Sequence, residues 1–165
     1  MKHNLINFIL FQVIWFVFIF SAADESSSLL IMGVTLLLLQ FLKNKQFKAD
    51  GLLILIAIII GIIHDSSLSY FNFIIYMYDF NINYSPIWII GLWVSFALTI
   101  NHSLTWLKEK KVLQVIFGLI GGPLAYFAGE KLGAIQLVNE HAIYILAISW
   151  AIATPVLFKF QKKGQ

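Results

Sequence analysis

Long apolar runs, separated by short polar segments, form the main pattern of this sequence. A transmembrane helix needs about 20 mostly apolar residues to cross a hydrocarbon core of roughly 30 Å. Six runs of about that length are bounded by charged or turn-forming residues. The pattern therefore predicts an all-α fold, a polytopic bundle of about six transmembrane helices. These helices are expected at residues 4–22, 27–42, 51–71, 86–107, 112–129 and 142–160.

The third apolar run is longer than one span. From Gly51 to Tyr78 it would measure about 42 Å if it were helical throughout, at roughly 1.5 Å per residue. The end of this run must therefore bend. Aromatic side chains crowd the same end, as expected for an aromatic belt at the membrane surface. They are Tyr70, Phe71, Phe73, Tyr76, Tyr78 and Phe80.

The composition agrees with a membrane protein and excludes several other classes. Hydrophobic residues make up 60% of the 165 residues and charged residues 12%, with a mean hydropathy of +0.86. Soluble domains are about 45–50% apolar and about 25% charged. A disordered chain and a nucleic-acid-binding module are therefore excluded, and the lack of cysteine excludes disulfides and thiolate chemistry. With only short loops between the runs, residues 1–165 are expected to form one integral membrane domain.

The positive charges lie on one side of the predicted membrane. The net charge of +3 comes from lysine alone, because the chain has no arginine. Short lysine-rich loops stay in the cytoplasm. Both termini are therefore predicted to be cytoplasmic, in a multi-pass protein with Asp24, Glu25, Asp79, Glu140 and Lys131 outside. The cytoplasmic lysines are Lys2, Lys43, Lys45, Lys48, Lys108, Lys110, Lys111, Lys159, Lys162 and Lys163.

The first run has an alternative interpretation as a secretory signal peptide. Lys2, the apolar stretch and the small residues at 21–23 match the pattern of a signal with its cleavage site. However, Asn7 and Gln12 interrupt the apolar stretch, and Gln12 with Trp15 indicates a packed helix face. We therefore expect the first helix to remain in the chain.

Ionisable side chains within the predicted helices are the first candidates for a functional site. Such groups are costly in hydrocarbon and usually face the interior of a bundle. Asp65 lies about 21 Å along the third helix, in the outer half of the core, next to His64. Tyr126 and Glu130 lie one turn apart on the fifth helix. These four are expected to form an outer polar layer, which either relays protons or only holds helices together.

A second polar layer is expected nearer the cytoplasmic side, at the end of the fourth helix. An imidazole beside amide and hydroxyl groups can shuttle a proton or hold a lipid headgroup, although a lone histidine also serves as a packing residue. Helix rise separates the two layers by more than about 10 Å, which argues against one site containing both. The layer is centred on Asn101, His102 and Ser103, and Asn7 and Gln12 of the first helix reach a comparable depth. Trp15, which shares a packed face with Gln12, is a further candidate for the intramembrane site.

Two glycines and a proline at residues 121–123 lie between the layers. Pro123 leaves the carbonyl of Leu119 without its helical partner, which can break the helix and expose an acceptor to a cavity. Gly118 and Gly122 form a GxxxG pair, which predicts close helix packing.

Familiar catalytic signatures are absent from the sequence. There is no H-E-x-x-H, G-x-S-x-G, P-loop or dinucleotide glycine motif. The four histidines are too few and too scattered for the histidine boxes of a membrane di-iron enzyme. We therefore expect no cofactor and no metal.

Several motifs together resemble a known family. The first is N-x-x-x-F-x-x-x-Q-x-x-W, at Asn4, Phe8, Gln12 and Trp15, and the second is G-x-x-x-D, at Gly61 and Asp65. The third is the stretch from Trp93 to Trp106, which includes the polar residues 101–103. The fourth is the stretch from Gly122 to Tyr126, followed by Gly129 and residues 132–134. This set is similar to the bacterial membrane family designated domain of unknown function 2878. The resemblance implies a short polytopic inner-membrane protein that keeps its first helix, and it implies no activity or cofactor.

The sequence leaves three functional hypotheses open. The first is a protein that holds or moves a lipid or small amphiphile in an intramembrane cavity lined by Asp65, Asn101 and His102. The second is an intramembrane enzyme that uses His102 or Asp65 as a general base on a lipid. The third is a structural subunit that joins a membrane-protein partner through packed helices. All three expect membrane lipid as a partner.

Overall fold

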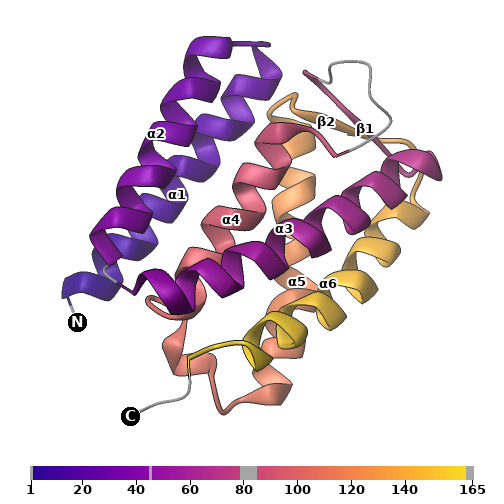
Figure 1. The fold of residues 1–165 in the computed structure, drawn as a ribbon. Coiled ribbons are helices and arrows are strands. Elements are labelled where there is room, and N and C mark those ends of the chain that lie inside the picture. The colour runs from indigo at the N-terminus through magenta and orange to yellow at the C-terminus, as the bar shows by residue number, and fades with distance from the viewer. Residues whose placement is uncertain (1, 45, 79–84, 163–165) are drawn as a thin grey trace.

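The computed structural model describes residues 2–44, 46–78 and 85–162, and this part of the chain is a helical bundle (Figure 1). The predicted all-α fold is confirmed. The start of α1 and the end of α6 lie at the same end of the bundle, which we call the terminal end. The elements are α1 (Lys2–Ala23), α2 (Ser27–Asn44), α3 (Phe47–Tyr70), β1 (Ile74–Tyr76), α4 (Ile87–Ile100), the 3₁₀ helix η1 (Thr105–Leu107), α5 (Lys111–Lys131), β2 (Ile135–Leu137) and α6 (His141–Lys159).

Five of these helices, α1, α2, α3, α5 and α6, are long and apolar enough to cross a membrane. The chain therefore has the helices of a multi-pass membrane protein. The fourth predicted span is shorter than expected, because α4 has 14 residues and measures only about 21 Å.

The prediction of one helix over 86–107 is wrong beyond Ile100. The backbone N–H groups of His102 and Leu104 both donate to the carbonyl of Thr99, at 3.0 and 2.9 Å, which closes a turn. The polar run at 101–103 favours this ending because its side chains bond to other elements instead of facing hydrocarbon. Two of the residues predicted on the fourth helix, Asn101 and His102, therefore lie in the turn that follows it.

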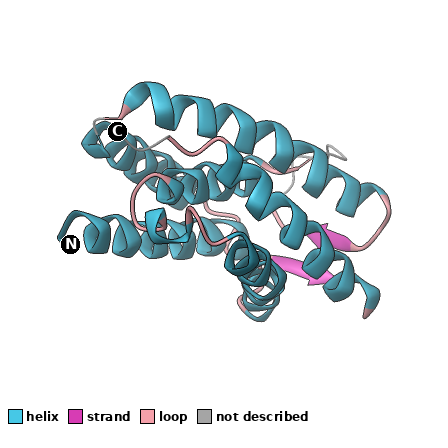
Figure 2. Ribbon diagram, turned by 90° about the horizontal axis from the view of Figure 1, so that it is seen from below, coloured by secondary structure: helices cyan, strands magenta, loops and turns pink. Residues whose placement is uncertain are grey.

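The start and end of α3 also differ from the prediction. It begins at Phe47, before the expected Gly51, because the buried Asp50 lies inside its first turn. It ends at Tyr70, which confirms that the long run bends. After the bend the chain forms β1, which pairs antiparallel with β2 in a two-stranded sheet that the sequence did not predict. Figure 2 shows the strands side by side, away from the terminal end.

The predicted aromatic belt is only partly present. Tyr70 and Phe71 are 73% and 64% exposed, as expected at a membrane surface. Tyr76 is buried instead, because the strand pairing turns it inward, so its place in the belt is a wrong prediction. The expected positions of Phe80, Asp79, Lys45 and Lys163 fall outside the described residues.

Small residues let the helices approach closely. The fully buried ring of Phe18 on α1 lies between Gly33 of α2 and Gly91 of α4, where any added Cβ would touch it. The predicted GxxxG face of α5 packs on α6, where Gly118 and Gly122 both lie against Trp150. The closest packing in the bundle is between α5 and α6, while α1 packs on α2 and α4, and α3 packs on α4.

Candidate functional site

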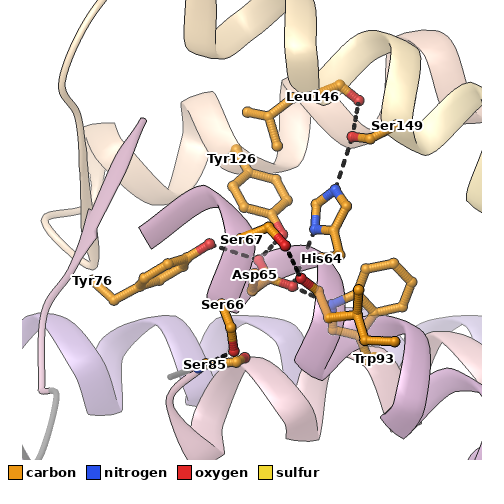
Figure 3. A network of polar contacts seen from close by, with 11 residues as sticks. His64, Asp65, Ser66, Ser67, Tyr76, Ser85, Trp93, Tyr126, Leu146 and Ser149 are labelled. Carbon is orange, nitrogen blue, oxygen red and sulfur yellow. Dashed lines mark hydrogen bonds and ion pairs between the residues drawn. The ribbon is translucent and has the colours of Figure 1, made fainter. Parts of the chain in front are cut away.

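The carboxylate of Asp65 is the centre of a buried hydrogen-bond network (Figure 3). The hydroxyl of Tyr76 donates to its Oδ1 at 2.7 Å, and the hydroxyl of Tyr126 donates to the same oxygen. The indole Nε1 of Trp93 donates to Oδ2 at 2.6 Å. One residue of α3 thereby joins β1, α4 and α5. Several donors of this kind satisfy an ionised carboxylate that no water reaches.

Local structure positions these donors. A Cβ added to Gly61, one turn before Asp65, would lie 2.6 Å from the ring of Trp93, so only glycine lets the indole lie this close to α3. Tyr76 is carried by β1, whose pairing with β2 aims it into the bundle. Burial, together with the negative charge of Asp65, raises the pKa of the Tyr76 hydroxyl well above its ordinary range. The tyrosine therefore stays protonated and remains a donor.

His64 links Asp65 to α6. Its Nδ1 lies 3.3 Å from Oδ2 of Asp65, and its Nε2 lies 2.8 Å from Oγ of Ser149. The rings of Trp93, Tyr126 and Trp150 surround the imidazole, with centroids 5.5, 6.2 and 6.1 Å away. The sequence did not single out Ser149, because a lone serine in an apolar helix carries no signal of its own.

Of the predicted outer layer, His64, Asp65 and Tyr126 come together, whereas Glu130 does not join them. Its Oε1 accepts a hydrogen bond from the backbone N–H of Leu137 at 2.8 Å. Glu130 therefore anchors β2, and its expected place in the polar layer is corrected.

A second network lies at the terminal end. Asp50 accepts hydrogen bonds from Nδ2 of Asn101 at 3.0 Å and contacts Nε2 of His102 at 2.9 Å. Oγ of Ser103 donates to Oδ1 of Asn7 at 2.8 Å, so the contact expected between the first helix and this region is present. Within the part of the chain that the structure describes, no hydrogen bond links this network to Asp65, in line with two separate layers.

Asp50 is a residue that sequence reasoning missed. A charged residue usually marks the end of an apolar run, so the pattern predicts that the third span begins only after Asp50. In the structure it is fully buried and gives His102 the carboxylate partner that helix spacing alone did not supply. The sequence does carry a signal for it: Asp50 follows Lys48 by two residues, so opposite charges lie close together at the start of a helix.

An apolar cavity of about 410 Å³ lies between α1, α4 and α5, with Trp150 and Thr154 of α6 at its base. We call it the groove. Some of its lining side chains, such as Phe8 and Leu124, are 46% and 59% exposed, so it is partly open at the side of the bundle. The groove is lined by Phe8, Phe11, Gln12, Trp15, Phe16, Ile19, Trp88, Ile89, Leu92, Trp93, Phe96, Thr99, Ser103, Leu104, Phe117, Gly118, Gly121, Gly122, Leu124, Ala125, Tyr126, Ala128, Gly129, Ile135, Trp150 and Thr154.

The groove contains only some of the predicted site residues. Gln12, Trp15, Ser103 and Tyr126 line it. Asp65, Asn101 and His102, which were expected to line a cavity, do not line the groove, because their side chains are engaged in the two buried networks. His64, Glu130 and Pro123 also lie outside the lining.

Pro123 does not open the helix. The helix α5 runs unbroken from Lys111 to Lys131 with the proline inside it. The helix break that would expose the carbonyl of Leu119 to a cavity is therefore not present. Within the described residues no three His, Asp or Glu side chains are grouped so that they could hold a metal ion.

Comparison with known proteins places the chain in a family without giving it an activity. No curated protein and no solved structure matches it. Residues 4–156 match the family described as "Protein of unknown function (DUF2878)". The match covers most of the chain, including α1, both polar networks and the groove. The chain therefore belongs to the DUF2878 family, as its sequence motifs predicted.

Proposed function

We propose that this multi-pass membrane protein holds the apolar chain of a membrane lipid in the groove between α1, α4 and α5. The groove is the observation that carries the proposal. Its volume of about 410 Å³ is in the range of small-molecule sites, roughly 300–1,000 Å³. The place of the protein in a bacterial inner membrane, with cytoplasmic termini, is part of the same proposal.

The length of the groove suits an extended hydrocarbon chain. Its lining runs from Phe8 to Ile19 on α1, from Trp88 to Thr99 on α4 and from Phe117 to Gly129 on α5. At roughly 1.5 Å per residue these stretches measure about 16 to 18 Å. The stretch on α1 lies well inside its helix, whereas the stretch on α4 spans nearly the whole of that short helix.

The chemistry of the walls favours the same occupant. Aromatic and aliphatic side chains make up most of the lining, and glycines 118, 121 and 122 leave room along α5. The hydroxyl of Thr154 is fully buried and has no hydrogen-bond partner within the described residues. A few polar groups in an otherwise apolar site fix the orientation of a ligand. Gln12, Ser103 and Thr154 could do so here.

Under this proposal the two buried networks help to shape the groove, because three of their members line it. Trp93 and Tyr126 each present a ring to the groove and a donor to Asp65. Ser103 is held at the other end by Asn7. Asp65 and Asn7 therefore set the positions of groove walls.

Tryptophan fluorescence tests the proposal directly. Four of the five tryptophans, Trp15, Trp88, Trp93 and Trp150, line the groove. A brominated fatty acid that enters it should quench their emission in detergent with a saturable dependence on concentration. An unbrominated lipid should reverse the quenching by competition.

A groove-filling variant sharpens this test. A Cβ added to Gly121 meets no atom within 4 Å, so Gly121→Phe can fill the groove without a clash at its base. Gly51, on α3 and outside the groove, is equally open and provides the control Gly51→Phe. We expect at least about tenfold weaker quenching for the first variant and wild-type quenching for the second. Non-saturable quenching, or equal quenching in both variants, would contradict lipid binding and favour the structural-subunit alternative.

A further inference from the structure

Ser149, His64 and Asp65 form a relay of a kind that activates a serine. We propose that Ser149 is an intramembrane nucleophile that attacks the carbonyl of a neutral lipid ester, with His64 as its general base. Asp65 acts as a positioning residue for His64. This activity goes beyond lipid holding in the groove and uses a different part of the bundle.

The order of atoms matches a nucleophile, a base and an orienting carboxylate. Nε2 of His64 lies 2.8 Å from the hydroxyl of Ser149, and Nδ1 lies 3.3 Å from Oδ2 of Asp65 (Figure 3). With the proton on Nδ1, directed at Asp65, Nε2 is free to accept the serine proton. The same hydroxyl can also donate to the carbonyl of Leu146, at the longer distance of 3.2 Å.

The carboxylate in this relay is rigidly held. Tyr76, Tyr126 and Trp93 donate to its two oxygens, and Asp65 is fully buried. A base works best when a third group fixes its tautomer and orientation. The fixed negative charge also stabilises the imidazolium that forms when His64 takes the serine proton.

The relay lies where α3 meets α6, outside the groove. Neither His64 nor Ser149 lines the groove, and both are only partly buried. Their neighbours Ile63 and Ile148 are 63% and 61% exposed, so the outward faces of both helices begin beside the relay. In a membrane this surface is covered by lipid. A substrate therefore reaches Ser149 from the bilayer.

The depth of His64 and Ser149 in the membrane determines which class of ester can reach them. His64 lies six residues before the end of α3 and Ser149 eight residues after the start of α6, or about 9 and 12 Å inside the bundle. The polar headgroup of a phospholipid holds its ester carbonyls at the edge of the hydrocarbon core. A neutral ester such as a wax ester or a triacylglycerol has no such anchor and enters the core. The geometry therefore favours neutral esters.

The reaction has two balanced steps. Oγ of Ser149 forms a bond to the acyl carbon while the bond to the alkoxy oxygen breaks, and the serine proton passes through His64 to the departing alcohol. Water, or the hydroxyl of a second lipid, then attacks the acyl-serine and loses its proton to His64. This step releases a fatty acid or a new ester and restores Ser149 with its proton.

A fluorophosphonate probe tests the nucleophile in the full chain in detergent. Such probes label serines activated by a base. We expect labelling that mass spectrometry maps to Ser149 and that is lost in Ser149→Ala and reduced at least tenfold in His64→Gln. Ser67, which lies exposed on α3 and donates only to the carbonyl of Ile63, provides the control Ser67→Ala, expected to label like wild type.

The same variants test the substrate class. In vesicles that contain a wax ester, wild-type protein should release fatty acid or transfer it, and Ser149→Ala should not. Thermal unfolding of each variant reports folding separately. An unlabelled wild-type protein, labelling that persists in Ser149→Ala, or ester cleavage confined to phospholipids would overturn the proposal. None of these results depends on lipid binding in the groove, because His64 and Ser149 lie outside it. The groove variant Gly121→Phe therefore tests the proposed function separately.

Discussion

The indole of Trp93 donates to the carboxylate of Asp65 at 2.6 Å while its ring face stacks on Trp150, with centroids 4.5 Å apart and planes 11° apart. One side chain of α4 therefore links the buried carboxylate on α3 to the wall of the groove on α6.

Asp65→Asn should destabilise the bundle. The amide nitrogen cannot accept a hydrogen bond, so at least one of the buried donors Tyr76, Tyr126 and Trp93 loses its partner. Hydrogen bonds to charged groups contribute about 1.5–3 kcal/mol each, and we expect a loss of about 3 kcal/mol in unfolding free energy. Thermal unfolding in detergent measures it. Asp24→Asn, at an exposed turn residue, is the control and should leave the midpoint unchanged.

Gly61→Ala should displace Trp93. The new Cβ would lie 2.6 Å from the indole ring, and overpacking of this kind costs about 1–3 kcal/mol. The unfolding midpoint should therefore fall. Gly51→Ala adds the same methyl group where nothing lies within 4 Å, and its gain in helix propensity should keep or raise the midpoint. Equal midpoints for the two variants would contradict the close approach of Trp93 to α3.

Ser103→Ala should loosen α1 from the turn after α4. It removes the hydroxyl that donates to Asn7, and we expect a cost of about 1 kcal/mol. A double-mutant cycle with Asn7→Ala measures the coupling between the two residues. Thr35, whose exposed hydroxyl bonds only within its own helix, provides the control Thr35→Ala. Strict additivity of the Asn7 and Ser103 substitutions would exclude the contact.

The predicted orientation can be tested by labelling, because the chain has no native cysteine. Asp24→Cys lies between α1 and α2, and Glu109→Cys lies between η1 and α5; both positions are exposed. In intact cells a membrane-impermeant maleimide should label Asp24→Cys only. Labelling of Glu109→Cys, but not Asp24→Cys, would show the reverse orientation.

The sequence predicted the helices well because hydrophobic length is a strong signal. It failed where tertiary contacts decide. Residues 101–103 continue an apolar helix in the pattern, yet Asp50 and Asn7 offer them better partners than hydrocarbon does. The three-residue strands β1 and β2 are too short to produce a periodic signal.

The site was predictable only in part, for a similar reason. Asp65 is conspicuous as a charge within a hydrophobic helix, and His64 and Tyr126 were correctly grouped with it at one depth. Trp93, Tyr76 and Ser149 complete the network from three other elements. Their side chains are ordinary for a membrane protein, and only the packing of the helices reveals that they meet. The groove, likewise, depends on how α1 and α5 are spaced.

The partners of Asp65 impose an order on biogenesis. Trp93 follows it by 28 residues and Tyr126 by 61, so both partners are synthesised later than Asp65 itself. An unpaired aspartate near the centre of a bilayer costs about 2.5–3.5 kcal/mol during insertion. The third helix therefore enters the membrane at a cost that its later partners on β1, α4 and α5 offset, and a chain truncated before α5 lacks the donor supplied by Tyr126.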